Sequence, residues 1–372
     1  MQLSNEDNLR LNVLLSQTLK AIRINEGSMT IHALTDKGEA RVQLNPTTRD
    51  EQYLRWVREL ISMKVTGSPG GYPIFMKRWT RMGHTDNTLE HMLLLGEPEA
   101  IVAMVHAPNL THEQGTYAWW ANPTTEVARR LLHYPDIVAG DLGKELANYL
   151  LEFLPFEEQQ KNVVETVKLC LQGELISEQQ KAELWKRAKR KNPYYVGFVH
   201  SKKHIPIDKK DHPAFSVVHS SLQSLLAESN SYATHLCELL SADGQKWLYA
   251  LQQSLRKPVD QDVVIALFIS IQHNFSLNFP ERSGVREIQQ ACERADQLCN
   301  GEIPCPDELQ SVLSTLDQSH TPLLAATLML AQLGEDTLIP IFAGNDSVGS
   351  VMRRRLEPVT TPILERIEQL MA

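Results

Sequence analysis

The sequence lacks an apolar run long enough to span a bilayer, and its first residues do not form the basic, apolar and small-residue succession of a signal peptide. Only five of its 372 residues are cysteine. An odd number of cysteines in a chain with no export signal is typical of reduced thiols. We therefore expect a cytoplasmic protein that makes no contact with membranes.

Motifs for catalysis and cofactor binding are also scarce. The glycine-rich run 67–73 lacks the Lys-Ser/Thr ending of a phosphate-binding loop, and the sequence has no nucleophile elbow, dinucleotide fingerprint or calcium loop. The densest histidine group matches no zinc pattern, and the lysines among its members would repel a cation. That group is His200, His204, His212 and His219. We expect no enzyme, no metal and no cofactor, although a catalytic triad assembled across the fold would leave no local motif.

The charge balance limits the partners. Charged residues make up 22% of the chain and hydrophobic residues 42%, as in ordinary globular proteins, and the formal net charge is −8. An acidic chain is unlike proteins whose whole surface binds nucleic acid, so nucleic acid would need a local basic patch.

Internal similarity is the strongest feature that is present. Residues 97–120 are repeated imperfectly by residues 162–185, and each copy holds an apolar helix face, a Leu, a helix start and a Trp. Capping boxes at Thr111 with Gln114 and at Ser177 with Gln180 mark the second helix of each copy. Repeats of this length are typical of stacked helical hairpins. The sequence therefore predicts a mainly α protein, either HEAT-like or an irregular α-bundle.

One short part has the period of β-strands. Apolar and polar residues alternate over 29–33 and 40–44, with a turn at 36–38, and a third strand is predicted at 21–24. An isolated hairpin is marginal, so this small antiparallel element must pack on the helices beside it.

Composition divides the chain into four parts. We expect an N-terminal helix, hairpin and helix over 1–66, a helical-hairpin region over 67–199, a linker rich in lysine and proline over 200–213, and a C-terminal helical region over 214–372.

Three groups of residues are candidates for function. The segment 74–82 mixes cations with aromatics, which suits contact with a partner, although an amphipathic element with snorkelling cations has the same composition. One member of a tryptophan pair is expected in the core, while the other is a candidate anchor. The predicted partner-binding residues are Lys77, Arg78, Trp79, Arg81, Trp119 and Trp120.

The second group is a basic helix end followed by two tyrosines. Cations in a last turn complement the helix dipole, but this run exceeds what capping needs, so RNA phosphates with a stacked base are the alternative. The residues are Lys186, Arg187, Lys189, Arg190, Lys191, Tyr194 and Tyr195.

The third group is a cysteine trio, Cys292, Cys299 and Cys305, which would serve a sulfur carrier if a thiol were exposed and its pKa lowered. The spacing is not that of a redox motif, and free cysteines are most often small buried apolar groups.

Several stretches resemble those of one known family. They are residues 3–15 (LSNEDNLRLNVLL), 67–73 with 77–83 (GSPGGYP and KRWTRMG), 94–100 (LLGEPEA), 153–158 (FLPFEE) and 191–198 (KNPYYVGF). Together they resemble the DsrS family of sulfur-oxidising bacteria, which is encoded with the reverse-acting dissimilatory sulfite reductase system. The resemblance is clearest over roughly the first 200 residues.

This resemblance implies a soluble cytoplasmic accessory protein of sulfur oxidation that is regulatory and not itself an enzyme, and it transfers no catalytic motif. Combined with the residue patterns, it leads us to expect a helical scaffold that binds a protein of the sulfur-oxidation system. An RNA-binding regulator and a thiol sulfur carrier are the alternatives.

Overall fold

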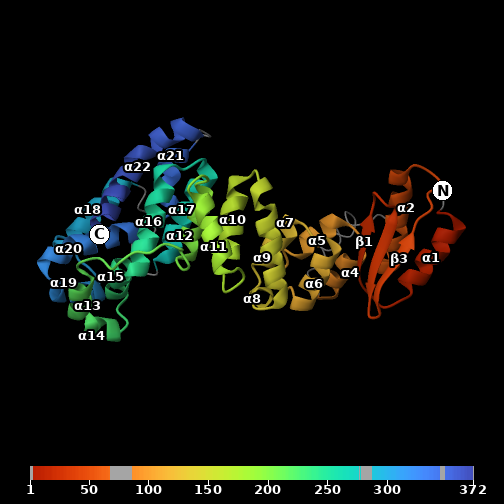
Figure 1. Ribbon diagram of the computed structural model, residues 1–372, viewed down its shortest axis with the longest axis horizontal. Coiled ribbons are helices and arrows are strands. Elements are labelled where there is room, and N and C mark those ends of the chain that lie inside the picture. Colours follow the sequence, from red (N-terminus) through yellow and green to blue (C-terminus); the bar gives the residue numbers. More distant parts are fainter. Residues whose placement is uncertain (1–2, 68–85, 276, 278–286, 344–347, 372) are drawn as a thin grey trace. The chain divides into compact units, whose positions relative to one another are not determined.

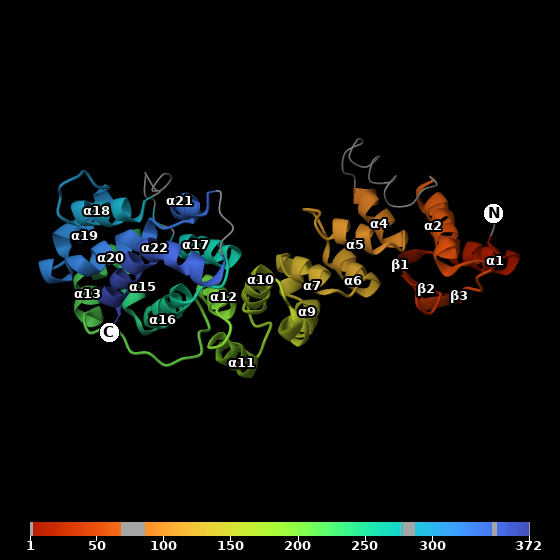
Figure 2. The same ribbon diagram turned by 90° about the horizontal axis from the view of Figure 1, so that it is seen from above.

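The computed structural model describes residues 3–67, 86–275, 277, 287–343 and 348–371 (Figures 1 and 2). Its contacts divide the chain into two compact units, unit 1 from Met1 to Phe153 and unit 2 from Leu154 to Ala372. The architecture is mainly α with one small sheet near the N-terminus, as the sequence predicts.

Unit 1 contains the sheet and a series of helices. Its elements are α1 (Asn5–Leu15), β1 (Leu19–Asn25), β2 (Thr30–Thr35), β3 (Gly38–Gln43), α2 (Asp50–Thr66), α4 (Asp86–Leu94), α5 (Pro98–Met104), α6 (His112–Ala121), α7 (Thr125–Leu131), α8 (Pro135–Val138) and α9 (Asp141–Phe153).

Unit 2 is helical over its described residues. Its elements are η1 (Leu154–Phe156), α10 (Gln160–Cys170), α11 (Glu178–Ala188), α12 (Pro193–Ser201), α13 (Phe215–Ser221), α14 (Gln223–Ala227), α15 (Ser231–Leu240), α16 (Ala242–Arg256), α17 (Gln261–Asn274), α18 (Ile288–Cys299), α19 (Asp307–Thr315), η2 (Gln318–His320), α20 (Thr321–Ala331), η3 (Glu335–Leu338), α21 (Ile339–Phe342) and α22 (Gly349–Leu370).

The sheet is antiparallel, with strand order β1-β2-β3. Thr35 pairs with Gly38 across a two-residue turn, so β2 and β3 form the predicted hairpin. The predicted third strand is β1, which pairs with β2. Backbone groups in an antiparallel pair alternate between the two sides of a strand. In this register the backbone N–H and C=O of Ile24 point away from β2, at the free edge of β1. The backbone groups of Glu39, Arg41 and Gln43 also point away from β2, at the free edge of β3.

The sheet has one apolar and one polar face. Ile22, Ile31 and Ala33 belong to a buried cluster that α1 and α2 complete with leucines, Tyr53, Val57 and Ile61. Arg23 and His32 lie side by side on the other face, in the register of adjacent strands. Helix α4 and helix α6 both contact β1 (Figure 1).

A buried polar contact fastens α1 to α2. The Tyr53 hydroxyl donates to Asp7 Oδ2 at 2.5 Å, and the backbone N–H of Asn45 donates to the same oxygen at 2.8 Å. Asp7 and Tyr53 are both 0% exposed. Burial and the adjacent Asp7 carboxylate raise the pKa of Tyr53, which therefore keeps its proton for this bond.

The repeat is visible as two similarly capped helices. Both predicted capping boxes form, at the start of α6 and at the start of α11. If the two caps are aligned, Thr111 is equivalent to Ser177, and Trp119 is then equivalent to Trp185. The alignment by sequence letters instead matched Trp120 with Trp185, and the structure corrects it by one residue. Trp119 and Trp185 are both buried.

Helix α12 occupies the interior of unit 2. It contacts α10, α16 and α17, and each residue from Pro193 to Val199 is buried (Figure 1). Gly197 lies against α10, where a Cβ atom would come within 2.5 Å of Val167 Cγ1. The short distance between these helices therefore depends on the missing side chain.

The predicted linker 200–213 lies within unit 2, since the contacts divide the chain at Phe153 instead. Residues 202–212 have no regular structure, but they are attached: Lys202 Nζ lies 2.6 Å from Glu238 Oε2, and the His212 N–H donates to the Leu240 carbonyl. Over the described residues, no helix is long and apolar enough to cross a bilayer.

Substituting Gly197 tests the close approach of α10 and α12. Gly197→Ala should lower the free energy of unfolding by about 1–3 kcal/mol, because the new methyl group overlaps Val167. The control is Gly27→Ala, whose Cβ would meet only Asn25 Oδ1 at 3.7 Å and should be nearly neutral. Urea unfolding followed by circular dichroism measures both, and equal stability of the two variants would contradict the packing.

The half-buried His200 predicts a loss of stability in acid. Its ring stacks on His273 at 4.6 Å, and burial, with the charges of Lys168 and His273, lowers the pKa of His200 to about 4. The unfolded state binds the proton more readily, so stability should decrease as the pH falls from about 6.5 to about 4. Unfolding free energies across this range should fall less in His200→Gln than in the parent. The exposed His219→Gln is the control, and a parent-like pH slope in His200→Gln would refute the prediction.

Candidate functional site

The two tryptophans of the predicted pair differ in burial and in their contacts. Trp119 is 8% exposed, its indole N–H donates to Glu145 Oε1 at 2.6 Å, and its ring packs edge-on against Tyr149. It therefore belongs to the core, and its predicted role as a partner contact is corrected. Trp120 is half-buried and lies beside a pocket of unit 1. Lys77, Arg78, Trp79 and Arg81 lie outside the described residues.

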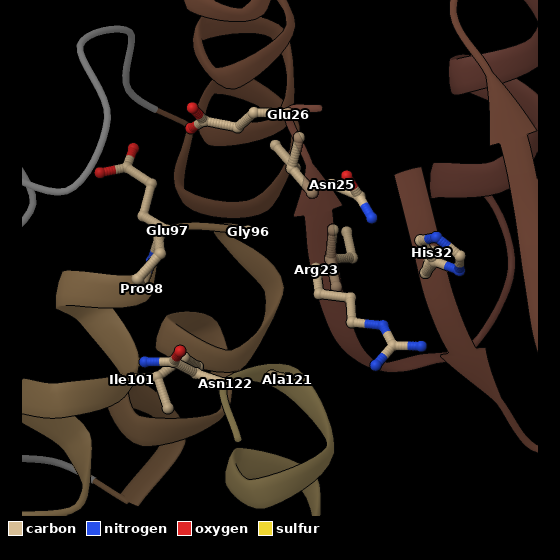
Figure 3. Close-up of a pocket in the computed structure, with 12 residues that line it drawn as sticks. Arg23, Asn25, Glu26, His32, Gly96, Glu97, Pro98, Ile101, Ala121 and Asn122 are labelled. Atoms are coloured by element: carbon tan, nitrogen blue, oxygen red, sulfur yellow. The ribbon is translucent and has the colours of Figure 1, made fainter. Parts of the chain in front are cut away.

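The pocket has a volume of about 480 Å³, within the range of ligand sites. One wall is the outer edge of β1 from Ile22 to Asn25 and the following Glu26, with His32 beside it (Figure 3). The other wall consists of Gly96 and Glu97 before α5, Pro98 at the start of α5, and the C-terminal end of α6. The site thus combines a strand edge with two helix ends.

The strand edge offers main-chain hydrogen bonds. No hydrogen bond joins the outward N–H and C=O of Ile24 to another residue in the part of the chain that the structure describes. Such unpaired edge groups are the template on which an extended peptide can add as a further strand.

Gly96 allows the second wall to approach β1. Its φ of 67° is in the left-handed region, and a Cβ there would come within 3.1 Å of Ile24. Glycine is the residue that adopts this conformation without steric cost, and it also leaves room for the isoleucine. The following Glu97 and Pro98 begin α5, so the wall is set by a helix start.

Arg23 connects the sheet to α6. Its guanidinium lies 4.6 Å from the centre of the Trp120 ring, and Nη1 donates to the Trp120 carbonyl at 3.4 Å. The same group reaches Glu39 Oε2 at 3.4 Å. Cation–π contacts of this kind contribute about 0.5–2 kcal/mol. Trp120 is thus held in place at the margin of the pocket.

Glu39 organises the polar face of the sheet. Its Oε1 is 2.7 Å from His32 Nδ1 and 3.1 Å from Arg41 Nε. The hydrogen bond from His32, with smaller contributions from Arg41 and Arg23, lowers the pKa of Glu39. The carboxylate therefore stays ionised and holds Arg23 and His32 in fixed positions beside the pocket.

Two carboxylates lie at the end of the pocket that is farther from Arg23. In Figure 3 the side chains of Glu26 and Glu97 extend toward this end from the two walls, and Arg23 lies toward the other end. Glu26 forms an ion pair with Arg58 of α2. The pocket therefore has Arg23 toward one end and two carboxylates at the other, where Arg58 compensates the charge of Glu26.

The basic segment keeps its cations at the surface but not its aromatics. Lys186, Lys189, Arg190 and Lys191 are exposed, and Arg187 pairs with Glu183 at 3.3 Å. The two tyrosines that follow are corrected from base-stacking groups to core residues. Tyr194 is 1% and Tyr195 8% exposed, and the Tyr195 ring packs edge-on against Trp185. They belong to the buried helix α12 and are not available to a base.

The cysteine trio is poorly suited to thiolate chemistry. Burial raises the pKa of Cys292, Cys299 and Cys305, to about 12 for Cys299, where the negative charge of Asp296 adds to the effect. The Cys305 thiol also donates to Gln310 Oε1 at 3.2 Å. Protonated thiols are weak nucleophiles, so these environments disfavour a sulfur carrier. No group of three or more metal-ligating side chains could hold a metal ion within the described ranges.

Sequence reasoning did not identify the pocket. The sequence patterns place Arg23 in the third strand predicted at 21–24 and give no functional role to any residue that lines the pocket. The available signal was Gly96 before a Glu-Pro helix start, since a glycine there indicates a left-handed or closely approached backbone. No protein-family model, curated protein or solved structure matches the chain.

The raised thiol pKa values predict slow sulfur uptake by the folded protein. Treatment with polysulfide at pH 7 should add little sulfur mass to the five cysteines, because the raised pKa values keep the thiols protonated and burial also shields Cys170 and Cys237. Unfolding in urea before treatment should make all five reactive. Mass spectrometry distinguishes the two states, and a persulfide on Cys305 of the folded chain at the rate of a free small thiol would restore the sulfur-carrier alternative.

Proposed function

We propose that the chain is a non-enzymatic accessory or regulatory protein of dissimilatory sulfur oxidation that acts in the cytoplasm as a helical protein-binding scaffold. The observation that carries the binding role is the pocket along the outer edge of β1, where the unpaired backbone of Ile24 faces a wall built on Gly96. The sulfur-oxidation context rests on the resemblance of the N-terminal half to the DsrS family.

The occupant that fits this site is an extended segment of a partner protein. Main-chain hydrogen bonds to Ile24 would add the segment beside β1. A lysine or arginine of the segment would lie at the acidic end formed by Glu26 and Glu97, and an apolar side chain would rest beside Ile101 and Pro98.

The fixed charges of the pocket support binding in preference to turnover. Arg23 is engaged by Trp120 and Glu39, Glu26 by Arg58, and His32 by Glu39. Groups held in this way are already positioned before a partner arrives, which lowers the entropic cost of association. Proton transfer would instead require one of them to leave its partner.

Reversing one charge of the pocket tests this role. Glu97→Lys should weaken capture of sulfur-oxidation proteins at least about tenfold, because it places a cation opposite the expected cation of the partner. Glu99→Lys makes the same change two residues along the chain, at an exposed position that does not line the pocket, and should leave capture unchanged. Thermal melting of both variants checks that the fold is retained.

The readout is affinity capture with the purified proteins encoded beside the dissimilatory sulfite reductase system. Equal capture by the two lysine variants would contradict the pocket as the contact. Joint replacement of Arg78 and Trp79 then tests the other predicted surface. Capture that survives all of these changes would reject the scaffold role of both surfaces.

A further inference from the structure

A second pocket, in unit 2, is lined by three arginines from two helices. It has a volume of about 340 Å³ and lies where α22 packs on α16. Arg353 and Arg354 come from the first turns of α22, and Arg256 is the last residue of α16. Residues distant in the sequence thus bring three positive charges to one hollow.

These charges have few partners within the protein. All three arginines are exposed, and the hydrogen bond from Arg353 Nη1 to the Pro258 carbonyl, at 3.3 Å, is the one such contact they make with the described residues. None of them forms an ion pair with a carboxylate of the described chain, although Glu357 also lines the pocket. The formal charge of the lining is therefore positive, and three guanidinium groups remain available to a ligand.

The rest of the lining resembles an organic ligand site. Thr361 places an exposed hydroxyl beside the arginines, while Leu255 and Leu364 provide apolar surface. Arg354, Thr361 and Leu364 recur at helical spacing along α22, so one face of this helix presents a charged, a hydroxyl and an apolar group in succession.

We infer that this pocket binds a small organic phosphate, with the phosphate dianion between Arg256, Arg353 and Arg354 and the organic part against Leu255 and Leu364. Guanidinium groups match phosphate oxygens with paired, charge-assisted hydrogen bonds, and arginine is the usual residue for this purpose. The volume is near the lower end of the range for ligand sites, which suits a compact molecule.

Calorimetric titration of the full chain with phenyl phosphate tests the assignment. We expect saturable binding that Arg354→Gln weakens at least about tenfold, because one charged pair of hydrogen bonds is lost. Arg355→Gln removes the same charge at the next residue, which is exposed but does not line the pocket, and should change the affinity less than about twofold. Glu357→Gln should strengthen binding, since it removes the negative charge of the lining.

Three results would overturn the inference. The first is no saturable binding of phenyl phosphate, and the second is equal weakening by Arg354→Gln and Arg355→Gln, which would indicate a general charge effect. The third is equal affinity for inorganic phosphate and phenyl phosphate, which would leave no role for the apolar lining. A short single-stranded RNA that binds these arginines without competition from phenyl phosphate would also overturn it.

Discussion

Unit 1 depends on one constraint: a three-stranded sheet with a single apolar face is stable only when that face is covered. Helices α1 and α2 provide the cover through the cluster around Tyr53, and the chain after α4 comes close to Ile22 and Ile24 through Gly96. The segment around Gly96 and the end of α6 extend beyond the edge of β1, and the pocket lies between them and this edge. The pocket therefore results from the way in which the sheet is buried. It lies at the edge of β1 that pairs with no further strand of the described residues.

Ion pairs and hydrogen bonds around Glu39 fix the side chains on the polar face of the sheet. One carboxylate, Glu39, accepts from Arg23, His32 and Arg41, so it compensates the positive charges of Arg23 on β1 and Arg41 on β3. Arg23 then extends to Trp120 and links the sheet with α6. Individually such half-exposed contacts contribute little to stability. Together they orient the side chains beside the pocket before any partner binds.

Much of the fold could be predicted from local patterns. The hairpin, its turn, the third strand and both capping boxes depend on neighbouring residues and are correct. The tryptophan register was off by one residue because Trp119 and Trp120 are adjacent on α6, and their burial in the folded chain shows that Trp119 is the one that faces inward. Tyr194 and Tyr195 were misjudged because the cations before them suggested an exposed surface, whereas the almost wholly apolar α12 is typical of a buried helix. Neither pocket could be predicted, since each depends on residues that meet only in the folded chain: Ile24 with Gly96 in unit 1, and Arg256 with Arg353 in unit 2.

The opposite edge of the sheet has a different consequence. The outward backbone groups of β3 belong to Glu39, Arg41 and Gln43, all exposed, and no strand of the described residues covers them. Charged side chains on such an edge discourage other chains from stacking onto it. The charged side chains of Glu39 and Arg41 therefore also protect this edge against aggregation. Making this strand apolar would remove that protection and favour the formation of fibres.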